Sequence, residues 1–164
     1  MTPLEIALCL AAAAIAGVLI GLNRDVAGKP MGARTLALVA LGAAIVTLAA
    51  INDEIVAGHP DSRSRVIQGV LQGVLTGIGF IGAGVIVQAR SRLEVHHLTT
   101  AATVWVTAAL GIACGLGEWA LAVLAVAFTL GILVLVKPVE DAVVAWLGSR
   151  EQLDRGKAEE SKND

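Results

Sequence analysis

Hydrophobic residues in this chain form long uninterrupted runs, and the short segments between them hold nearly all of the charged residues. Five runs that lack Asp, Glu, Lys and Arg are each long enough to cross the hydrocarbon core of a bilayer as a helix. They cover residues 6–22, 35–51, 66–88, 98–116 and 119–136. Gly115, Gly117 and Glu118 separate the last two runs and predict a tight turn. The pattern predicts an all-α, polytopic membrane domain of five transmembrane helices over residues 1–136.

Composition supports a membrane protein and excludes several other classes. Of the 164 residues, 56% are hydrophobic and only 16% are charged, against about a quarter in soluble domains. No polar segment is long enough to form a separate catalytic domain, and a net charge of −2 argues against a nucleic-acid binder. The two cysteines, Cys9 and Cys114, form no CxxC motif, so we interpret them as small buried hydrophobic residues.

The basic residues predict the orientation of the helices. Ten of the twelve Lys and Arg residues lie in the first loop, the third loop and the tail. Because basic residues favour the cytoplasmic side, the N-terminus should lie outside and the C-terminus in the cytoplasm of a bacterial inner membrane. No basic residue precedes the first run, so we interpret it as a retained helix rather than a signal peptide.

The tail divides into two predicted parts. Pro138 is suited to open a short cytoplasmic amphipathic helix over residues 137–150, with Trp146 at headgroup level. Its apolar stripe consists of Val139, Ala142, Val143, Trp146 and Leu147. Alternatively, the fifth transmembrane helix continues directly into solvent. The charged residues 151–164 predict a disordered end.

Small residues recur at helical spacing and predict how the helices associate. Lipid is as apolar as leucine, so close backbone approach and interhelical hydrogen bonds must hold the bundle together. The pattern predicts that 66–88 packs against 98–116 through two small-residue faces. The stripes are Gly69, Gly73 and Gly77, beside Gln68, Gln72 and Thr76, in one run, and Thr99, Thr103, Thr107, Gly111 and Gly115 in the other; Gly17 and Gly21 form a shorter stripe in the first run.

Two further motifs carry little chemistry. The segment GIGFIGAG contains G-x-G-x-x-G, but it lies inside an apolar run, whereas a dinucleotide site needs a preceding strand. Gly79, Gly82 and Gly84 therefore indicate a place where another backbone approaches. His96 and His97 are adjacent and point in different directions on a helix, which makes them a poor metal pair. No cofactor is expected, and whether a metal binds is unknown.

The first loop holds a polar cluster at the predicted cytoplasmic end. Four helix ends converge there, and we expect a pocket in which Asp25 pairs with Arg24 or Arg34 and threonines line the wall. Its predicted residues are Arg24, Asp25, Lys29, Arg34, Thr99, Thr100 and Thr103. The alternative is a packing core flanked by ordinary positive-inside residues.

Three segments in this order resemble the MgtC/SapB family of bacterial membrane proteins. They are GLNRDVAGKPMGARTLALVALGAA (residues 21–44), GIGFIGAGVI (77–86) and HLTTAATVWVTAALGIACGLG (97–117). The resemblance implies about five spans with the C-terminus inside. It also implies a role in adaptation to low magnesium and in membrane energetics, through membrane partners that include the F-type ATP synthase. Many members carry an ACT-like C-terminal domain, which we do not expect in this chain.

This sequence departs from the family pattern at several positions. Asn23 replaces a usual Glu in the first motif, and Thr99 and Val106 replace an Asn and a Cys that matter in virulence-linked members. We therefore expect a non-enzymatic regulator that binds other membrane proteins, with further copies of itself among them. The alternative is a transporter or channel for magnesium or another small solute. No acidic or basic residue lies within the five runs to form an ion path.

The predicted orientation is testable with a C-terminal tag. Because the basic loops favour the cytoplasm, we expect protease to reach the tag only after intact spheroplasts are lysed. A tag that is cleaved from intact spheroplasts would contradict this orientation.

Overall fold

The computed structural model describes residues 1–52, 60–87 and 98–163, and nearly all of these residues are helical. The helices are α1 (Pro3–Val26), α2 (Ala33–Ile51), α4 (Pro60–Val87), α5 (Leu98–Leu116) and α6 (Trp119–Asn163). Each contains a segment long and apolar enough to span a membrane. The predicted all-α fold with five membrane-spanning helices is therefore confirmed.

Local sequence signals explain where individual helices begin and end. Thr2 and Glu5 form a reciprocal capping box before α1, and Pro3 occupies the first turn, where a missing N–H costs nothing. Between α5 and α6, Gly117 adopts a positive φ of 77°. The amides of Gly117 and Glu118 bond back to the carbonyls of Cys114 and Ala113, which closes the predicted tight turn.

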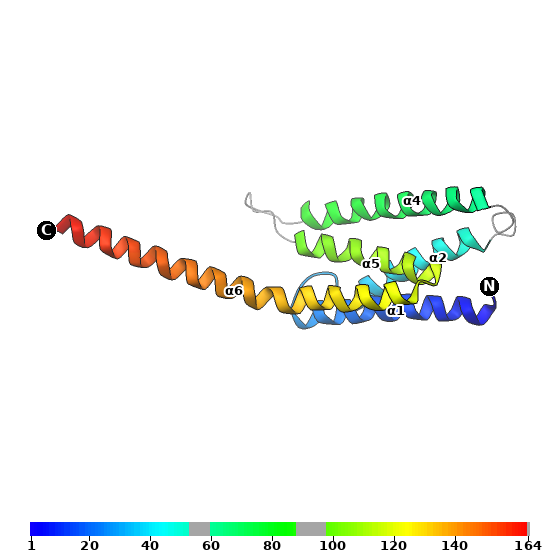
Figure 1. The fold of residues 1–164 in the computed structure, drawn as a ribbon, viewed down its shortest axis with the longest axis horizontal. Coiled ribbons are helices and arrows are strands. Elements are labelled where there is room, and N and C mark those ends of the chain that lie inside the picture. Colours follow the sequence, from blue (N-terminus) through cyan, green and yellow to red (C-terminus); the bar gives the residue numbers. More distant parts are fainter. Residues whose placement is uncertain (53–59, 88–97, 164) are drawn as a thin grey trace. The chain divides into compact units, whose positions relative to one another are not determined.

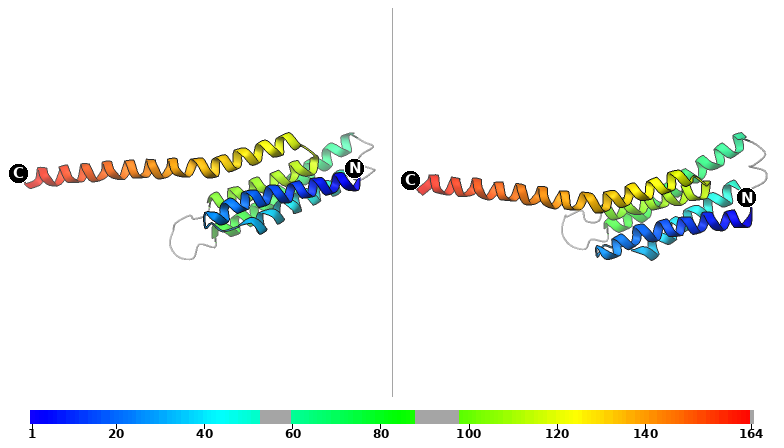
Figure 2. Two further views of the ribbon diagram at one scale, coloured as in Figure 1. Left: turned by 90° about the horizontal axis from the view of Figure 1, so that it is seen from below. Right: turned by 60° about the horizontal axis from the view of Figure 1, so that its bottom comes forward.

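Residues 1–129 form one compact unit, and its helices alternate in direction (Figures 1 and 2). Helices α1, α2 and α5 all contact one another, whereas α4 packs on α5 and α2. As a result, the end of α1, the start of α2, the end of α4 and the start of α5 lie at the same end of this unit (Figure 1).

Helix α2 is held between two glycine-containing helices. A Cβ added at Gly21 of α1 would collide with the Ala33 backbone, and one added at Gly111 of α5 would collide with the Ala40 carbonyl. A Cβ at Gly115 would lie 2.8 Å from the Thr47 Cβ. Buried alanines fill the space between the helices: Ala13, Ala40, Ala44 and Ala122, together with Cys114, form one cluster. Close backbone approach therefore holds the core together, as expected where lipid removes the hydrophobic drive.

Helix α4 packs through large apolar side chains rather than through its glycines. Leu71, Val74 and Ile78 lie against a cluster that includes Ala108 and Ile112 of α5. This differs from the expected contact between the glycine stripes of 66–88 and 98–116. The glycines of α5 face α2, where two backbones meet, and so the side of α5 that remains for α4 carries larger residues.

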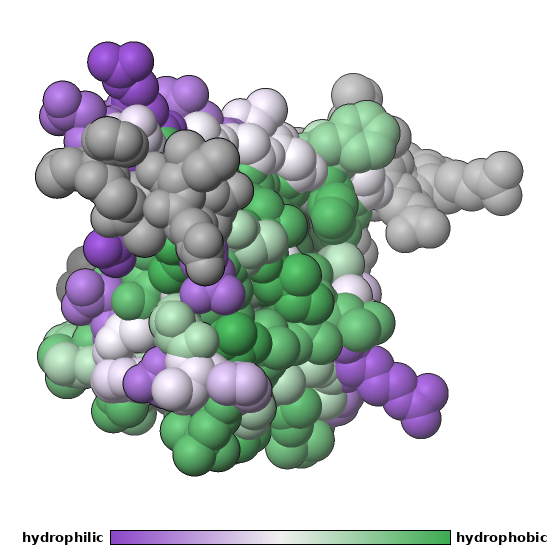
Figure 3. Space-filling view, turned by 90° about the vertical axis from the view of Figure 1, so that its right-hand side faces the viewer, coloured by the Kyte–Doolittle hydropathy of each residue, from purple (hydrophilic) through white to green (hydrophobic). Residues whose placement is uncertain are grey.

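The outer surface of the membrane-spanning bundle is strongly apolar. In Figure 3, hydrophobic residues cover broad areas, and hydrophilic residues gather in separate groups. Exposed apolar side chains on the first part of α6 include Leu121, Val123, Leu124 and Phe128. Such a surface is suited to lipid, because the chain has too little polar surface to cover it in water.

Residues 130–164 form a second unit. Helix α6 continues through Pro138 and ends at Asn163. The structure thus has one continuous helix where the sequence predicted a break before 137–150 and a disordered end over 151–164. The composition of the end explains the difference, because Glu, Gln, Leu, Arg, Lys and Ala are strong helix formers. The alternative of a fifth helix that continues past the span agrees with the structure.

The contact between α5 and α2 predicts opposite effects of the same substitution at two glycines. Gly111→Ala should destabilise the protein by about 1–3 kcal/mol, because its new methyl group meets the Ala40 backbone. Gly42→Ala is the matched control, since nothing lies within 4 Å of an added Cβ there, and it should stabilise α2 by about 0.5–1 kcal/mol. Thermal unfolding in detergent measures both effects. Equal melting temperatures for the two variants would contradict the close packing.

Candidate functional site

The predicted polar cluster is centred on one buried arginine. The Arg24 side chain, in the last turn of α1, is only 3% exposed. Its Nε and Nη2 atoms both donate to the Pro30 carbonyl oxygen at 3.2 Å. Nη2 also donates to Thr100 Oγ1, and Nη1 donates to Thr103 Oγ1 at 3.5 Å. One guanidinium therefore joins α1, the first loop and the start of α5. We call Arg24, Pro30, Thr100 and Thr103 together the Arg24 junction.

The neighbouring Asp25 has a different role from the expected one. Its carboxylate makes no ion pair with Arg24 or Arg34 within the ranges that the structure describes; instead, Oδ2 accepts a hydrogen bond from the Ala33 N–H at 2.9 Å. Gly32 is the N-cap residue of α2 and has no side chain to fill that role. Asp25 therefore caps α2 from the end of α1, and a carboxylate near a helix N-terminus is also favoured by the helix dipole.

The other predicted pocket residues divide into buried and exposed groups. Thr100 and Thr103 are buried beside Arg24, and Thr103 Oγ1 also donates to the Thr99 carbonyl at 2.6 Å. Thr99, Lys29 and Arg34 are exposed. The structure thus brings together Arg24, Thr100 and Thr103, but it places the remaining cations of the cluster on the surface.

The carbonyl group that holds Arg24 was not evident from the sequence. Gly28 and Met31 both have φ of 63°, and this left-handed backbone turns the loop so that the Pro30 carbonyl faces the guanidinium. Gly28 could have indicated this turn from the sequence, because glycine adopts positive φ without strain. Met31 gave no such signal. His96 and His97 lie outside the described residues.

A second polar surface lies on the side of α4 that faces away from the bundle. Among the residues that the structure describes, nothing within 4 Å would meet a Cβ added at Gly69, Gly73, Gly77, Gly79 or Gly84. A Cβ at Gly82 would have one such neighbour, Ala101 of α5. Phe80 lies on the same side and is 84% exposed. Gln68, Gln72 and Thr76 are exposed beside the glycines. We call this surface, made of Gln68, Gly69, Gln72, Gly73, Thr76, Gly77 and Phe80, the open α4 face.

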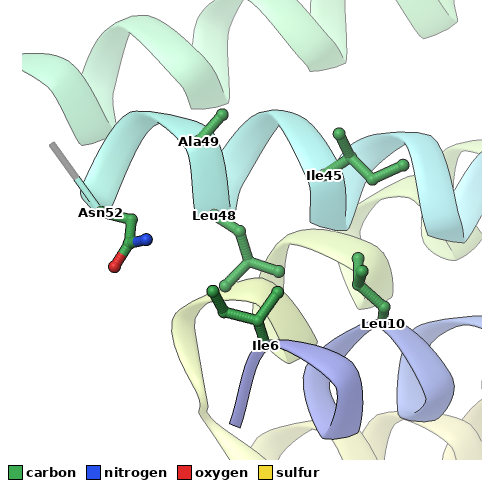
Figure 4. A pocket seen from close by; sticks show the side chains of 6 residues that line it. All are labelled: Ile6, Leu10, Ile45, Leu48, Ala49 and Asn52. Carbon is green, nitrogen blue, oxygen red and sulfur yellow. The ribbon is translucent and has the colours of Figure 1, made fainter. Parts of the chain in front are cut away.

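A third feature is an apolar groove between α1 and α2 at the opposite end of the bundle (Figure 4). Its volume is about 390 Å³. Five of its six lining residues are apolar, and Asn52 is the exception; the others are Ile6, Leu10, Ile45, Leu48 and Ala49. Asn52 Oδ1 accepts a hydrogen bond from the Met1 ammonium at 3.2 Å. No titratable side chain lines the groove, so it has no evident chemistry.

Comparison with known proteins now identifies the family. The family model described as "MgtC family" matches residues 10–142, and this range includes both the Arg24 junction and α4. The chain belongs to the MgtC family. Since it also has five helices of membrane-spanning length, it is a multi-pass membrane protein of that family.

Several relatives in the MgtC family are similar to this chain. Protein SrpB from Synechococcus elongatus is 40% identical over 159 residues, which cover 92% of this chain and 82% of the relative. Protein MgtC from Salmonella typhimurium is 42% identical over 67% of this chain, and Protein SapB from Bacillus subtilis is 36% identical over 69%. The matched regions span 43% and 48% of those two relatives, so the chain covers about half their length. No solved structure matches the chain.

The cap that Asp25 supplies predicts that two substitutions are coupled. A Cβ at Gly32 would collide with the Asp25 carboxylate, so Gly32→Ala should displace the cap and cost about 1 kcal/mol. Asp25→Ala should cost a similar amount, but Gly32→Ala should cost little in the Asp25→Ala background. Thermal unfolding of the two single variants and the double variant measures this coupling. Additive losses in the double variant would contradict the capping role.

Proposed function

We propose that this protein is a non-enzymatic regulator in the bacterial inner membrane that acts by binding other membrane proteins through the open α4 face. Its biological setting would be adaptation to low magnesium and control of membrane energetics. The C-terminus would lie in the cytoplasm, in line with the distribution of Lys and Arg.

The observation that supports this proposal is the composition of the open α4 face. Gln68 and Gln72 lie within a span, are exposed, and make no hydrogen bond to any described residue. An unpaired amide in hydrocarbon is unfavourable, and glycines at four-residue spacing allow another helix to approach closely. A surface with both features is suited to a partner helix rather than to lipid.

Family membership supports the proposed physiological setting and the choice of the first partner to test. Relatives carry the name MgtC, and the resemblance seen in the sequence implies a link to magnesium limitation and to the F-type ATP synthase. The ATP synthase is therefore the first membrane partner to test. A second copy of the chain is another candidate, because glutamine both donates and accepts hydrogen bonds and can pair with its own copy across a twofold axis.

One feature of α4 also favours a second candidate function, a transporter for magnesium or another small solute. Gln68, Gln72 and Thr76 form a polar row along the span, and two copies could enclose it between them. Magnesium prefers carboxylates and keeps several waters, which a row of amides suits poorly. Magnesium flux into proteoliposomes that contain the folded protein would favour the transporter and contradict the regulator.

Substitution on α4 tests the proposed role without disturbing the bundle. Gly73→Leu fills the open face, and its Cβ has no neighbour within 4 Å among the described residues. We therefore expect the variant to fold and insert normally while losing its partner and its growth benefit in low magnesium. Gly42→Leu, on an equally open position of α2, is the matched control and should keep both. Growth of a deletion strain complemented by each variant, with crosslinking to the ATP synthase, measures the effect. A Gly73→Leu variant with full activity would contradict the proposal.

A further inference from the structure

The buried charge of Arg24 has no counter-charge in the described protein. All of its hydrogen-bond acceptors are neutral: one backbone carbonyl and two threonine hydroxyls. Asp25 is the nearest acidic residue in sequence, and its carboxylate bonds to the Ala33 amide instead. Because transfer of an ion out of water is costly, buried arginines are normally paired with an anion.

The hydrogen bonds of the guanidinium also leave one nitrogen weakly held. Nη1 makes a single contact, to Thr103 Oγ1 at 3.5 Å, which is beyond the usual range for N–H···O bonds. Thr103 does not depend on this contact, since its hydroxyl donates to the Thr99 carbonyl at 2.6 Å. Nη1 is therefore the atom of Arg24 that is available to a stronger acceptor.

The surroundings of Arg24 are positively charged, which favours an anion, and they lie at one end of the membrane-spanning helices. Thr100 belongs to the first turn of α5, where the helix dipole is positive and does not neutralise a cation. Lys29 and Arg34, both exposed, add positive charge at the same end of the bundle. Helices α1 and α5 each contain a segment long and apolar enough to span a membrane, and α1 ends here while α5 begins here. A bilayer around these segments would therefore place this end at the level of lipid phosphates.

We propose that the Arg24 junction binds a phosphate oxyanion, with the N–H groups of Arg24 Nη1 as the donors that hold it. Arginine suits this role because its planar guanidinium matches the geometry of phosphate oxygens. The oxyanion comes from the headgroup of an anionic lipid or from free phosphate in the aqueous phase. This inference does not depend on the proposed regulatory function, and it concerns a different surface from the open α4 face.

Thermal unfolding of the full chain in nanodiscs tests the site. The discs contain digalactosyldiacylglycerol alone, which carries no phosphate, the same lipid with phosphatidylglycerol, or the same lipid with added inorganic phosphate. We expect at least one oxyanion source to raise the melting temperature of the wild type, and Arg24→Gln to bind it about tenfold more weakly, since it lacks the charge-assisted bond. A rise with phosphatidylglycerol alone assigns the lipid headgroup as the source, and a rise with inorganic phosphate assigns the free anion.

Two controls separate a binding site from a structural role and from general surface charge. Lys29→Gln removes an exposed cation at the same end and should keep most of the stabilisation. If Arg24→Gln lowers the melting temperature equally in every disc, or if Lys29→Gln loses as much stabilisation as Arg24→Gln, the proposal is overturned. If Arg24→Gln fails to fold, the wild type alone tests the proposal. A wild-type melting temperature that neither oxyanion source raises would overturn it.

Discussion

The hydrogen bonds of one buried guanidinium, that of Arg24, hold together the end of the bundle at which the candidate polar site lies. Arg24 joins the last turn of α1 to the Pro30 carbonyl and to two hydroxyls of α5. In doing so it determines where the first loop runs, and the loop in turn places Gly32 and the start of α2 against Asp25. These two adjacent residues therefore stabilise different helices: Arg24 bonds to the start of α5, and Asp25 caps α2.

The remainder of the bundle follows from the constraint that lipid places on helix association. Since apolar burial gives no net drive between helices in a bilayer, contact depends on how closely two backbones approach. Gly21 and Gly111 allow this approach on the two sides of α2. The same constraint applies to the open α4 face. Its glycines and glutamines have the composition of a helix contact, yet within the described ranges a Cβ added at Gly69, Gly73 or Gly77 would meet nothing within 4 Å.

Periodicity and charge predicted the fold well because a membrane span needs a long run without charge, and such runs are visible in the sequence. The α5 boundaries, for example, coincide with the predicted run 98–116. The sequence also indicated the glycine stripes, but it could not show which neighbour each one meets. Gly111 meets α2 rather than α4, since the partner of a helix face depends on the arrangement of the whole bundle.

Within the candidate site, the sequence pointed to Arg24, Thr100 and Thr103 but predicted the wrong partner for Arg24. Opposite charges next to each other in sequence suggested an ion pair, whereas the backbone geometry of the loop offers Arg24 a carbonyl and offers Asp25 an amide. The positive φ of Met31, which helps to turn that loop, has no signature in the residue type. The end of α6 was likewise hard to predict, because charged residues with high helix propensity suit both a disordered tail and a helix.

A photo-crosslinking scan along α4 in native membranes tests whether the open α4 face binds a partner helix. A photoreactive residue would replace each position of α4 in turn, and the adducts would be separated into protein and lipid. We expect protein adducts on the open α4 face, at Gln68, Gln72 and Thr76, with helical periodicity. Lipid adducts alone at these three positions would contradict this expectation.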